Sequence, residues 1–291
     1  MGHNQEYKMK ISKEQMVNIY YNEYVNGGNL SKLDRKYNIY SGYFSRWFKV
    51  LGFEIRNNDI NSKLYTFNED YFTDIDNQDK AYWLGFIFAD GYILSKRKHS
   101  NRKLGVSLSE KDICHLEKFK ECIEGNMPIP VYNVVSGYNL DSKYCRILLT
   151  SKKTADDLIS HGVLEHKTNI ITFPSLREDL KRHFIRGYFD GDGSVWKQKG
   201  KDVNIEQYSI SFIGTDELLT KTMECLLNDG AILRTYKINK RKENQIVSNF
   251  KFGGNNNTIR FLNYIYNDSH IYLERKYNIY LDLIKLIDSR S

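Results

Sequence analysis

The chain has 291 residues, 41% of them hydrophobic and 27% charged, which is typical of a globular protein and excludes a disordered or fibrous one. The longest apolar run, residues 81–89, is too short to span a bilayer, and the polar residues 1–10 lack the apolar core of a secretory signal. The four cysteines form no C-x-x-C pair, which argues against a zinc ribbon or a disulfide scaffold and favours the reducing cytoplasm. The formal net charge of +7 is compatible with a nucleic-acid partner.

Residues 1–60 predict three short helices. Ser12 and Gln15 form a capping-box pattern at the start of the first helix, while Asn29 and Ser41 stand where they could cap the second and the third. Two short helices joined by a tight turn form a helix-turn-helix, in which the third helix here would be the recognition helix.

The third predicted helix offers a candidate DNA-binding face. Tyr43, Arg46 and Lys49 would point outward, opposite the apolar side chains of the same helix, and they suit contacts with phosphates and base edges. The alternative interpretation is a helical bundle that binds nothing or that docks on the rest of the chain.

Basic residues gather in two hairpin-like stretches, residues 96–103 and residues 237–242. The candidate DNA-binding residues in and near these hairpins are Lys96, Arg97, Lys98, Arg102, Lys103, Lys197, Lys199, Lys240, Arg241 and Lys242. The alternative is that these charges are solvated loop tips.

The sequence after residue 60 is duplicated. Residues 83–91 (WLGFIFADG) resemble residues 185–193 (IRGYFDGDG), and residues 164–171 (LEHKTNII) share five of eight positions with residues 273–280 (LERKYNIY). Two landmarks in the same order at nearly the same offset predict two copies of one fold. We therefore expect a helix-turn-helix domain at residues 1–60, a first repeat at residues 61–172 and a second at residues 173–291.

Each copy predicts the order αββαββα. Asp76 and Ser175 would cap the first helices, which run to the Asp-Gly pairs. The strands are expected at 92–109, 129–133 and 144–150 in the first copy, and at 195–213, 232–239 and 245–252 in the second. The predicted fold class is α+β, with two pseudo-symmetric repeats that form a saddle of antiparallel sheets, plus the small all-α domain.

The two Asp-Gly helices carry small residues one helical turn apart, namely Gly85, Ala89, Gly187 and Gly191. Such faces let two helix backbones meet, which would bring Asp90 and Asp192 together at their C-terminal ends. Two carboxylates at two negative helix ends repel each other, and a divalent cation offsets that repulsion. Oxygen ligands favour Mg²⁺, which is the usual ion for phosphodiester cleavage. The alternative for each Asp-Gly is a simple turn.

These two segments resemble the paired motifs of the single-chain LAGLIDADG homing endonucleases, and the resemblance covers about residues 65–291. The N-terminal unit is similar to the helix-turn-helix domains of some phage and bacterial members. The resemblance implies a monomer that holds double-stranded DNA on its saddle and cuts both strands to leave short 3′ overhangs, in a bacterial or phage-infected cell. Asp90 and Asp192 would bind Mg²⁺, with the carbonyls of Ala89 and Gly191 as further ligands.

The resemblance also suggests roles for other residues of the centre. Lys237 resembles an active-site lysine of the family, and the symmetry-matched Lys167 and Lys276 are candidates for phosphate contacts. The earlier acidic position of the motif is Asp190 in the second copy and Phe88 in the first, where we expect core packing.

Two other functions use the same scaffold. One is a DNA-binding transcriptional regulator that has lost cleavage, and the other is an RNA maturase, which would add intron RNA as a partner. Loss of cleavage predicts loss of the metal-binding acids, so the presence of Asp90 and Asp192 favours the endonuclease.

Overall fold

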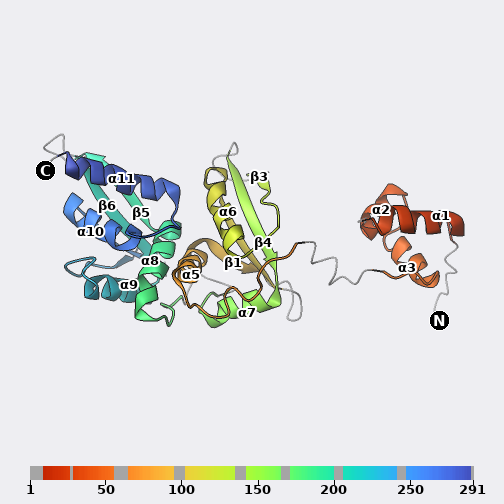
Figure 1. The fold of residues 1–291 in the computed structure, drawn as a ribbon, viewed down its shortest axis with the longest axis horizontal. Helices are drawn as coiled ribbons and strands as arrows, with labels where there is room; N and C mark the ends of the chain where they lie inside the picture. Colours follow the sequence, from red (N-terminus) through yellow and green to blue (C-terminus); the bar gives the residue numbers. More distant parts are fainter. Residues whose placement is uncertain are drawn as a thin grey trace. The chain divides into compact units, whose positions relative to one another are not determined.

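The structure is a computed structural model that describes residues 9–26, 29–55, 65–94, 102–134, 142–164, 171–199, 206–240 and 247–289. The chain divides into two compact units, Met1–Leu64 and Tyr65–Ser291 (Figure 1). No helix in the described ranges is long and apolar enough to cross a membrane. Several residues singled out above lie outside these ranges: Lys96, Arg97, Lys98, Lys167, Arg241 and Lys242.

The first unit consists of short helices around its own apolar core. They are α1 (Lys13–Ile19), which continues into a π-helical turn (Tyr20–Tyr24), α2 (Leu30–Lys36) and α3 (Tyr43–Val50). The predicted caps of the first two helices are confirmed: Ser12 and Gln15 form a capping box, and the Asn29 side chain accepts two backbone hydrogen bonds. Phe44 and Phe48 are fully buried in the core of this unit.

The predicted cap of α3 is wrong. Gly42 and not Ser41 stands at the cap position, and its φ of 85° is one that glycine adopts without strain. The buried Asp34 of α2 accepts hydrogen bonds from the backbone N–H groups of Gly42 (2.7 Å) and Phe44 (3.1 Å). A side chain from the preceding helix therefore satisfies the N-terminus of α3.

The second unit contains two repeats of the predicted order. The elements of the first are α5 (Gln78–Asp90), β1 (Gly91–Leu94), β2 (Lys103–Ser109), a 3₁₀ turn (Glu110–Asp112), α6 (Ile113–Cys122), β3 (Val131–Asn133), β4 (Lys143–Thr150) and α7 (Lys152–Ser160). Those of the second are α8 (Glu178–Asp192), β5 (Ser194–Lys199), β6 (Glu206–Gly214), α9 (Asp216–Asn228), β7 (Asn239–Lys240), β8 (Ser248–Gly253), α10 (Asn255–Tyr266) and α11 (Glu274–Asp288). The strands form two antiparallel sheets, β1-β2-β4-β3 and β5-β6-β8-β7. The predicted α+β class is confirmed.

Three local expectations are wrong. The side chain of Asn77, not of Asp76, caps α5, because its Oδ1 accepts from the N–H groups of the first turn. The cap position of α8 is Arg177, not Ser175, and it makes no side-chain cap bond. The strand expected at 232–239 is mostly not formed: in the described part of the chain β7 covers Asn239–Lys240, and the N–H of Ile232 bonds to Leu226 O at the end of α9 (3.1 Å).

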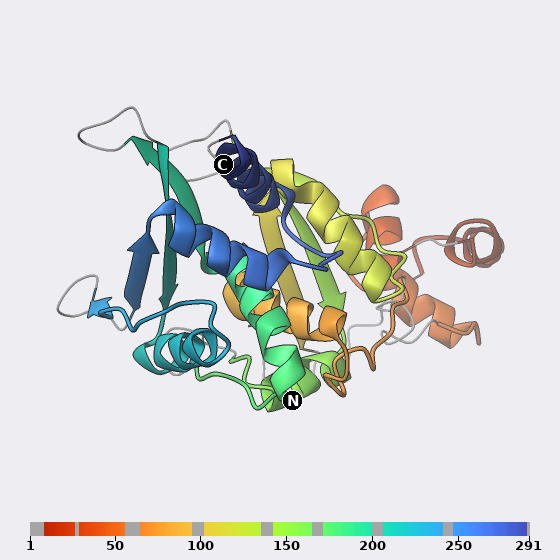
Figure 2. The same cartoon turned by 60° about the vertical axis from the view of Figure 1, so that its left-hand side comes forward.

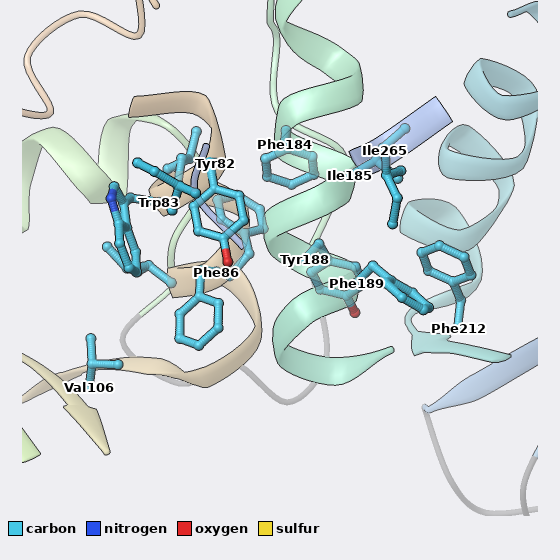
Figure 3. Packing of buried hydrophobic residues seen from close by; sticks show 14 of the residues in the cluster. Tyr82, Trp83, Phe86, Val106, Phe184, Ile185, Tyr188, Phe189, Phe212 and Ile265 are labelled. Atoms are coloured by element: carbon cyan, nitrogen blue, oxygen red, sulfur yellow. The ribbon is translucent and has the colours of Figure 1, made fainter. Parts of the chain in front are cut away.

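The two Asp-Gly helices, α5 and α8, lie side by side between the sheets (Figures 1 and 2). Aromatic side chains pack around them, among them Tyr82 and Phe86 of α5 and Phe184 and Tyr188 of α8 (Figure 3). Alternate strand residues such as Leu104 and Val106 are buried against the helices. We call the opposite side of each sheet its outer face.

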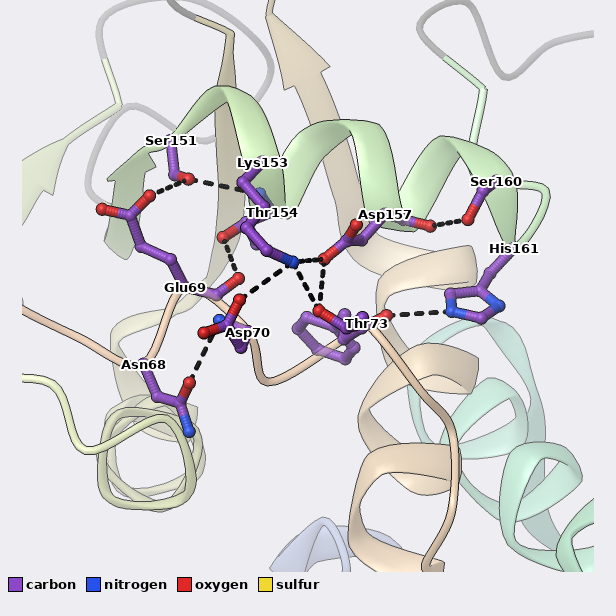
Figure 4. A network of polar contacts seen from close by, with 11 residues as sticks. Asn68, Glu69, Asp70, Thr73, Ser151, Lys153, Thr154, Asp157, Ser160 and His161 are labelled. Carbon is purple, nitrogen blue, oxygen red and sulfur yellow. Dashed lines mark hydrogen bonds and ion pairs between the residues drawn. The ribbon is translucent and has the colours of Figure 1, made fainter.

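Polar contacts with α7 hold the segment that leads into α5 (Figure 4). Glu69 accepts hydrogen bonds from the Ser151 hydroxyl at its carboxylate (2.6 Å) and from the Thr154 hydroxyl at its backbone oxygen (3.1 Å). Lys153 forms an ion pair with Asp70 at 3.0 Å, next to these bonds. These contacts fix the path of the chain into the first motif helix.

Candidate metal and cleavage centre

The helices α5 and α8 meet backbone to backbone. A Cβ atom at Gly85 would lie 2.1 Å from the backbone oxygen of Phe184, and one at Gly187 would lie 1.9 Å from that of Tyr82. No side chain larger than hydrogen fits at such distances. Both glycines therefore lie where the two helix backbones meet.

The approach continues to the C-terminal ends of both helices. A Cβ atom at Gly191 would lie 2.2 Å from the Cβ of Ala89 and 3.2 Å from Oδ2 of Asp90. The last residues of the two helices are Asp90, which is half-buried, and Asp192, which is exposed. The carboxylate of α5 therefore stands beside the end of α8.

A buried lysine completes this site. Lys276 at the start of α11 donates hydrogen bonds through Nζ to the backbone oxygens of Phe189 (2.5 Å), Asp190 (2.8 Å) and Gly193 (2.5 Å). Its burial lowers the pKa of Lys276 to about 8, while the carboxylates of Asp190, Asp90 and Asp192 act in the opposite direction. An ammonium at the negative end of α8 is favourable. Lys276 is 2% exposed, so the structure does not support our expectation of a surface phosphate contact.

Asp190 is not aimed at the centre. It is fully buried and accepts hydrogen bonds from the hydroxyls of Tyr82 (2.7 Å) and Tyr266 (2.6 Å) and from the N–H of Leu273 (2.9 Å). Its counterpart Phe88 is also buried, with its ring 5.1 Å from that of Phe184 in an edge-on contact, which confirms the expected core packing. The earlier acidic position of the motif is structural in this chain.

The donor set at the helix ends fits a hard divalent cation. No group of three or more His, Cys, Asp or Glu side chains that could hold a metal occurs among the residues that the structure describes. Two carboxylates with nearby backbone oxygens leave several positions for water and phosphate oxygens, which is how Mg²⁺ is usually bound. The residues that would hold it are Asp90 and Asp192, with the carbonyls of Ala89 and Gly191.

Lys237 lies away from these helix ends. It is exposed and precedes β7, which is the strand of its sheet farthest from β5. Because neighbouring strands are 4.7–4.9 Å apart, β7 lies about 14 Å from the strand that follows Asp192. Lys276 and not Lys237 is the lysine that the structure brings to the centre; its signal in the sequence was the repeated L-E-x-K-x-N pattern.

The strand register separates the predicted basic residues. Lys103 is on the outer face of its sheet, since its neighbour Leu104 is buried. Lys197 and Lys240 pair with the buried Tyr208 and Ser248, so they lie on the helix side instead.

Two further basic residues have other surroundings. Arg102 forms an ion pair with Asp156 of α7, close to the start of β2. The backbone of Lys199 ends β5, but its side chain lies outside the described part.

The outer faces carry polar and aromatic side chains that sequence reasoning missed. In the first sheet they are Tyr92, Ser107, Tyr132, Tyr144 and Arg146, and in the second they are Trp196, Gln198, Ser209, Ser211, Asn249 and Lys251. Alternation along each strand carries this signal, but it becomes readable only when the register is known.

In the first unit, the structure contradicts the predicted exposure of Tyr43. Tyr43 is fully buried, and its hydroxyl accepts hydrogen bonds from the N–H groups of Lys10 (2.7 Å) and Ile11 (2.9 Å). Arg46 and Lys49 are exposed on α3, as expected.

One family model matches part of this chain. Residues 179–266, which span most of α8 to the end of α10, match the family model of the LAGLIDADG-like domain. The matched range lies within the second repeat. A search of curated proteins finds no match.

Solved structures that match this chain include three described as LAGLIDADG proteins on DNA. The homing endonuclease I-GzeII in complex with its DNA target is 16% identical to this chain, with a TM-score of 0.47. The match covers 74% of this chain and 91% of the I-GzeII chain. The meganuclease I-AabMI bound to uncleaved DNA is 15% identical with a TM-score of 0.44, with coverage of 74% and 90%. The homing endonuclease I-LtrWI bound to target DNA is 12% identical with a TM-score of 0.45, with coverage of 76% and 92%.

Proposed function

We propose that this chain, whose residues 179–266 match the LAGLIDADG-like domain, is a site-specific endonuclease that cuts both strands of double-stranded DNA. The observation that carries the proposal is the convergence of Asp90 with the end of α8 at a backbone-to-backbone helix contact, between two sheets with polar outer faces. The repeats, residues 61–172 and 173–291, would each bind one half of the target. A regulator without cleavage would have no need for both acids at this position.

We propose the following roles in hydrolysis for the side chains of the centre. Asp90 and Asp192 would hold Mg²⁺, which would help to activate the attacking water and to stabilise the leaving oxygen. In each strand the water oxygen forms a new bond to phosphorus while the P–O3′ bond breaks, and a proton passes to O3′. Cuts on both strands at offset positions would leave short 3′ overhangs.

Lys276 would position the centre without touching the reacting atoms. Its three bonds to the last turn of α8 hold the backbone on both sides of Asp192. Its charge also offsets part of the repulsion between the two acids. We assign this role to Lys276 in preference to Lys237.

A cleavage selection tests the function directly. The full-length protein is incubated with a randomised duplex library, and the cut molecules are sequenced after treatment with Mg²⁺ or with EDTA. The proposal predicts recovery of one related group of sequences with Mg²⁺ and none with EDTA. Absence of enriched cut molecules in the presence of Mg²⁺ would contradict it.

For the first unit we propose a helix-turn-helix that lengthens the contact with DNA through Arg46 and Lys49. Both side chains are exposed on α3, so replacing them should not unfold the unit. An Arg46→Ala, Lys49→Ala variant should bind more weakly and lower the slope of log K against log salt by about 1.8. An unchanged slope and an unchanged footprint would make the unit a structural appendage.

A further inference from the structure

Arg146 stands on the outer face of β4, opposite Ser107 of β2. Its neighbours along the strand, Cys145 and Ile147, are fully buried against the helices, so the alternation turns Arg146 to the other side. Its backbone is fixed on both sides, by the ladder with β2 and by a bond from its N–H to Pro130 O (3.3 Å). The side chain therefore projects from a rigid part of the sheet.

Aromatic side chains hold the guanidinium in place. The rings of Tyr132 and Tyr144 stack at 5.3 Å, and Cζ of Arg146 lies 5.0 Å from the centre of the Tyr132 ring. Tyr92 is on the same face, with its hydroxyl 3.4 Å from Oγ of Ser107. An arginine over an aromatic ring is ordered before it binds, so it loses less conformational freedom on contact with a ligand.

This group keeps donors for a ligand. A guanidinium has five N–H donors in a planar fork, which is more than the neighbouring tyrosine hydroxyls can occupy. The fork matches a planar pair of acceptors better than a single anionic oxygen. In the major groove of DNA that pair is O6 and N7 of guanine.

The second sheet offers a different side chain at the matching place. Gly91 pairs with Val106, and in the second repeat Ser194, the residue after Gly193, pairs with Ser211. If that ladder is continued by one residue, Gly193, the counterpart of Gly91, lies opposite Phe212. Phe212 is therefore the counterpart of Val106. By the same registers Asn249, opposite Ile213, is the counterpart of Arg146. An Asn side chain suits N6 and N7 of adenine.

We propose that Arg146 is a base-reading residue that selects guanine in the half-site bound by the first repeat. At the symmetry-related position of the other half-site, the base pair faces Asn249 and not an arginine. We therefore expect adenine to be favoured there. This inference rests on the proposed function. Strand β4 lies two strand spacings, about 10 Å, from β1, which is the strand that follows Asp90. We therefore expect the selected base pair in the inner part of the half-site, near the cleavage centre.

A binding selection in EDTA tests the inference. The full-length wild type, Arg146→Ala and Arg146→Lys each select duplexes from one randomised library, and Arg260→Ala serves as the control. Arg260 is exposed on α10, so the control removes one positive charge from the helix side and leaves the outer faces unchanged.

The wild type and Arg260→Ala should select the same site, with guanine fixed at one inner position of one half. Arg146→Ala should lose that preference at this position alone, and its affinity for the guanine-containing site should fall about 5- to 100-fold. Arg146→Lys keeps the charge but not the fork, so it should recover affinity without full discrimination.

Two outcomes would overturn the inference while leaving the proposed function intact. One is an unchanged preference in Arg146→Ala, and the other is an equal loss of affinity for all sequences, as expected of a phosphate contact. A wild type that selects no sequence would contradict the proposed function itself, and this inference with it.

Discussion

The two motif helices are alike where their backbones meet and differ at other buried positions. Where α5 and α8 touch, both carry glycine at the point of closest approach. At three other equivalent positions, the side chains are buried in both helices but apolar only in the first. These pairs are Ala81 and His183, Leu84 and Arg186, and Phe88 and Asp190.

The difference follows from what each helix packs against. Helix α8 lies against α10 and the segment before α11, which offer buried backbone groups to bond. Arg186 donates to Ile265 O (3.3 Å) and bonds to Nδ1 of His183 (2.7 Å), while Asp190 accepts from Leu273. The glycine contact is thus the same in both helices, whereas the three differing positions follow from the neighbours that each helix has.

The largest stability effect should come from the glycine contact. Gly187→Ala places a methyl carbon only 1.9 Å from the backbone oxygen of Tyr82, so the helices must separate. We expect a loss of about 3 kcal/mol or more in the free energy of unfolding. Cleavage should also decline, because a shift of about 1 Å disturbs the centre.

Gly125→Ala is the matched control, because its Cβ would meet the flexible Met127 side chain at 2.6 Å and not backbone. It should cost far less in a urea titration. Equal losses in the two variants would show that the contact between α5 and α8 is not as close as described.

A smaller effect is expected at the positions that differ. Asp190→Asn replaces one acceptor oxygen by an amide donor that faces tyrosine hydroxyls and a backbone N–H. We expect a loss of about 2 kcal/mol. The equivalent change in the first repeat, Phe88→Leu, should cost about 1 kcal/mol. Urea titrations that rank the two the other way would contradict the importance of the polar network.

The smallest effect concerns pH. Burial, with help from Arg186 and Arg182, lowers the pKa of His183 from 6.5 to about 3. Between pH 6.5 and pH 3 the unfolded chain therefore binds a proton at His183, whereas the folded chain does not. The free energy of unfolding falls as the pH drops through that window. His183→Asn keeps an acceptor for Arg186 and cannot be protonated, so it should lose about 1 kcal/mol less between pH 6.5 and pH 5. Parallel stability curves for wild type and variant would contradict this.

The sequence predicted the parts of the centre that depend on spacing within one helix. Gly85 and Gly187 carry the signal of close packing, and Asp90 and Asp192 follow it at a fixed distance. Side chains whose face depends on pairing could not be placed, because a register shift of one residue moves a side chain across the sheet. That is why the face of Lys197 could not be given and Arg146 was missed.

Other predictions were wrong because contacts with residues outside the helix determine the structure. Tyr43 matched an exposed position of α3, but its hydroxyl bonds to the backbone of residues 10 and 11 and its ring is buried. Asp34 caps α3 from the preceding helix, which a search for a cap directly before the helix does not find.

The central claim is that one acid from each repeat supplies the cleavage centre. The most direct measurement is cleavage of a selected target with Mg²⁺ by the wild type, Asp90→Asn and Asp192→Asn, with binding measured in parallel in EDTA. Each variant should lose at least about 10³-fold in the rate of double-strand cutting, because metal charge stabilisation amounts to several kcal/mol, while its affinity for the site changes little. Cutting by either variant at nearly the wild-type rate would contradict the account.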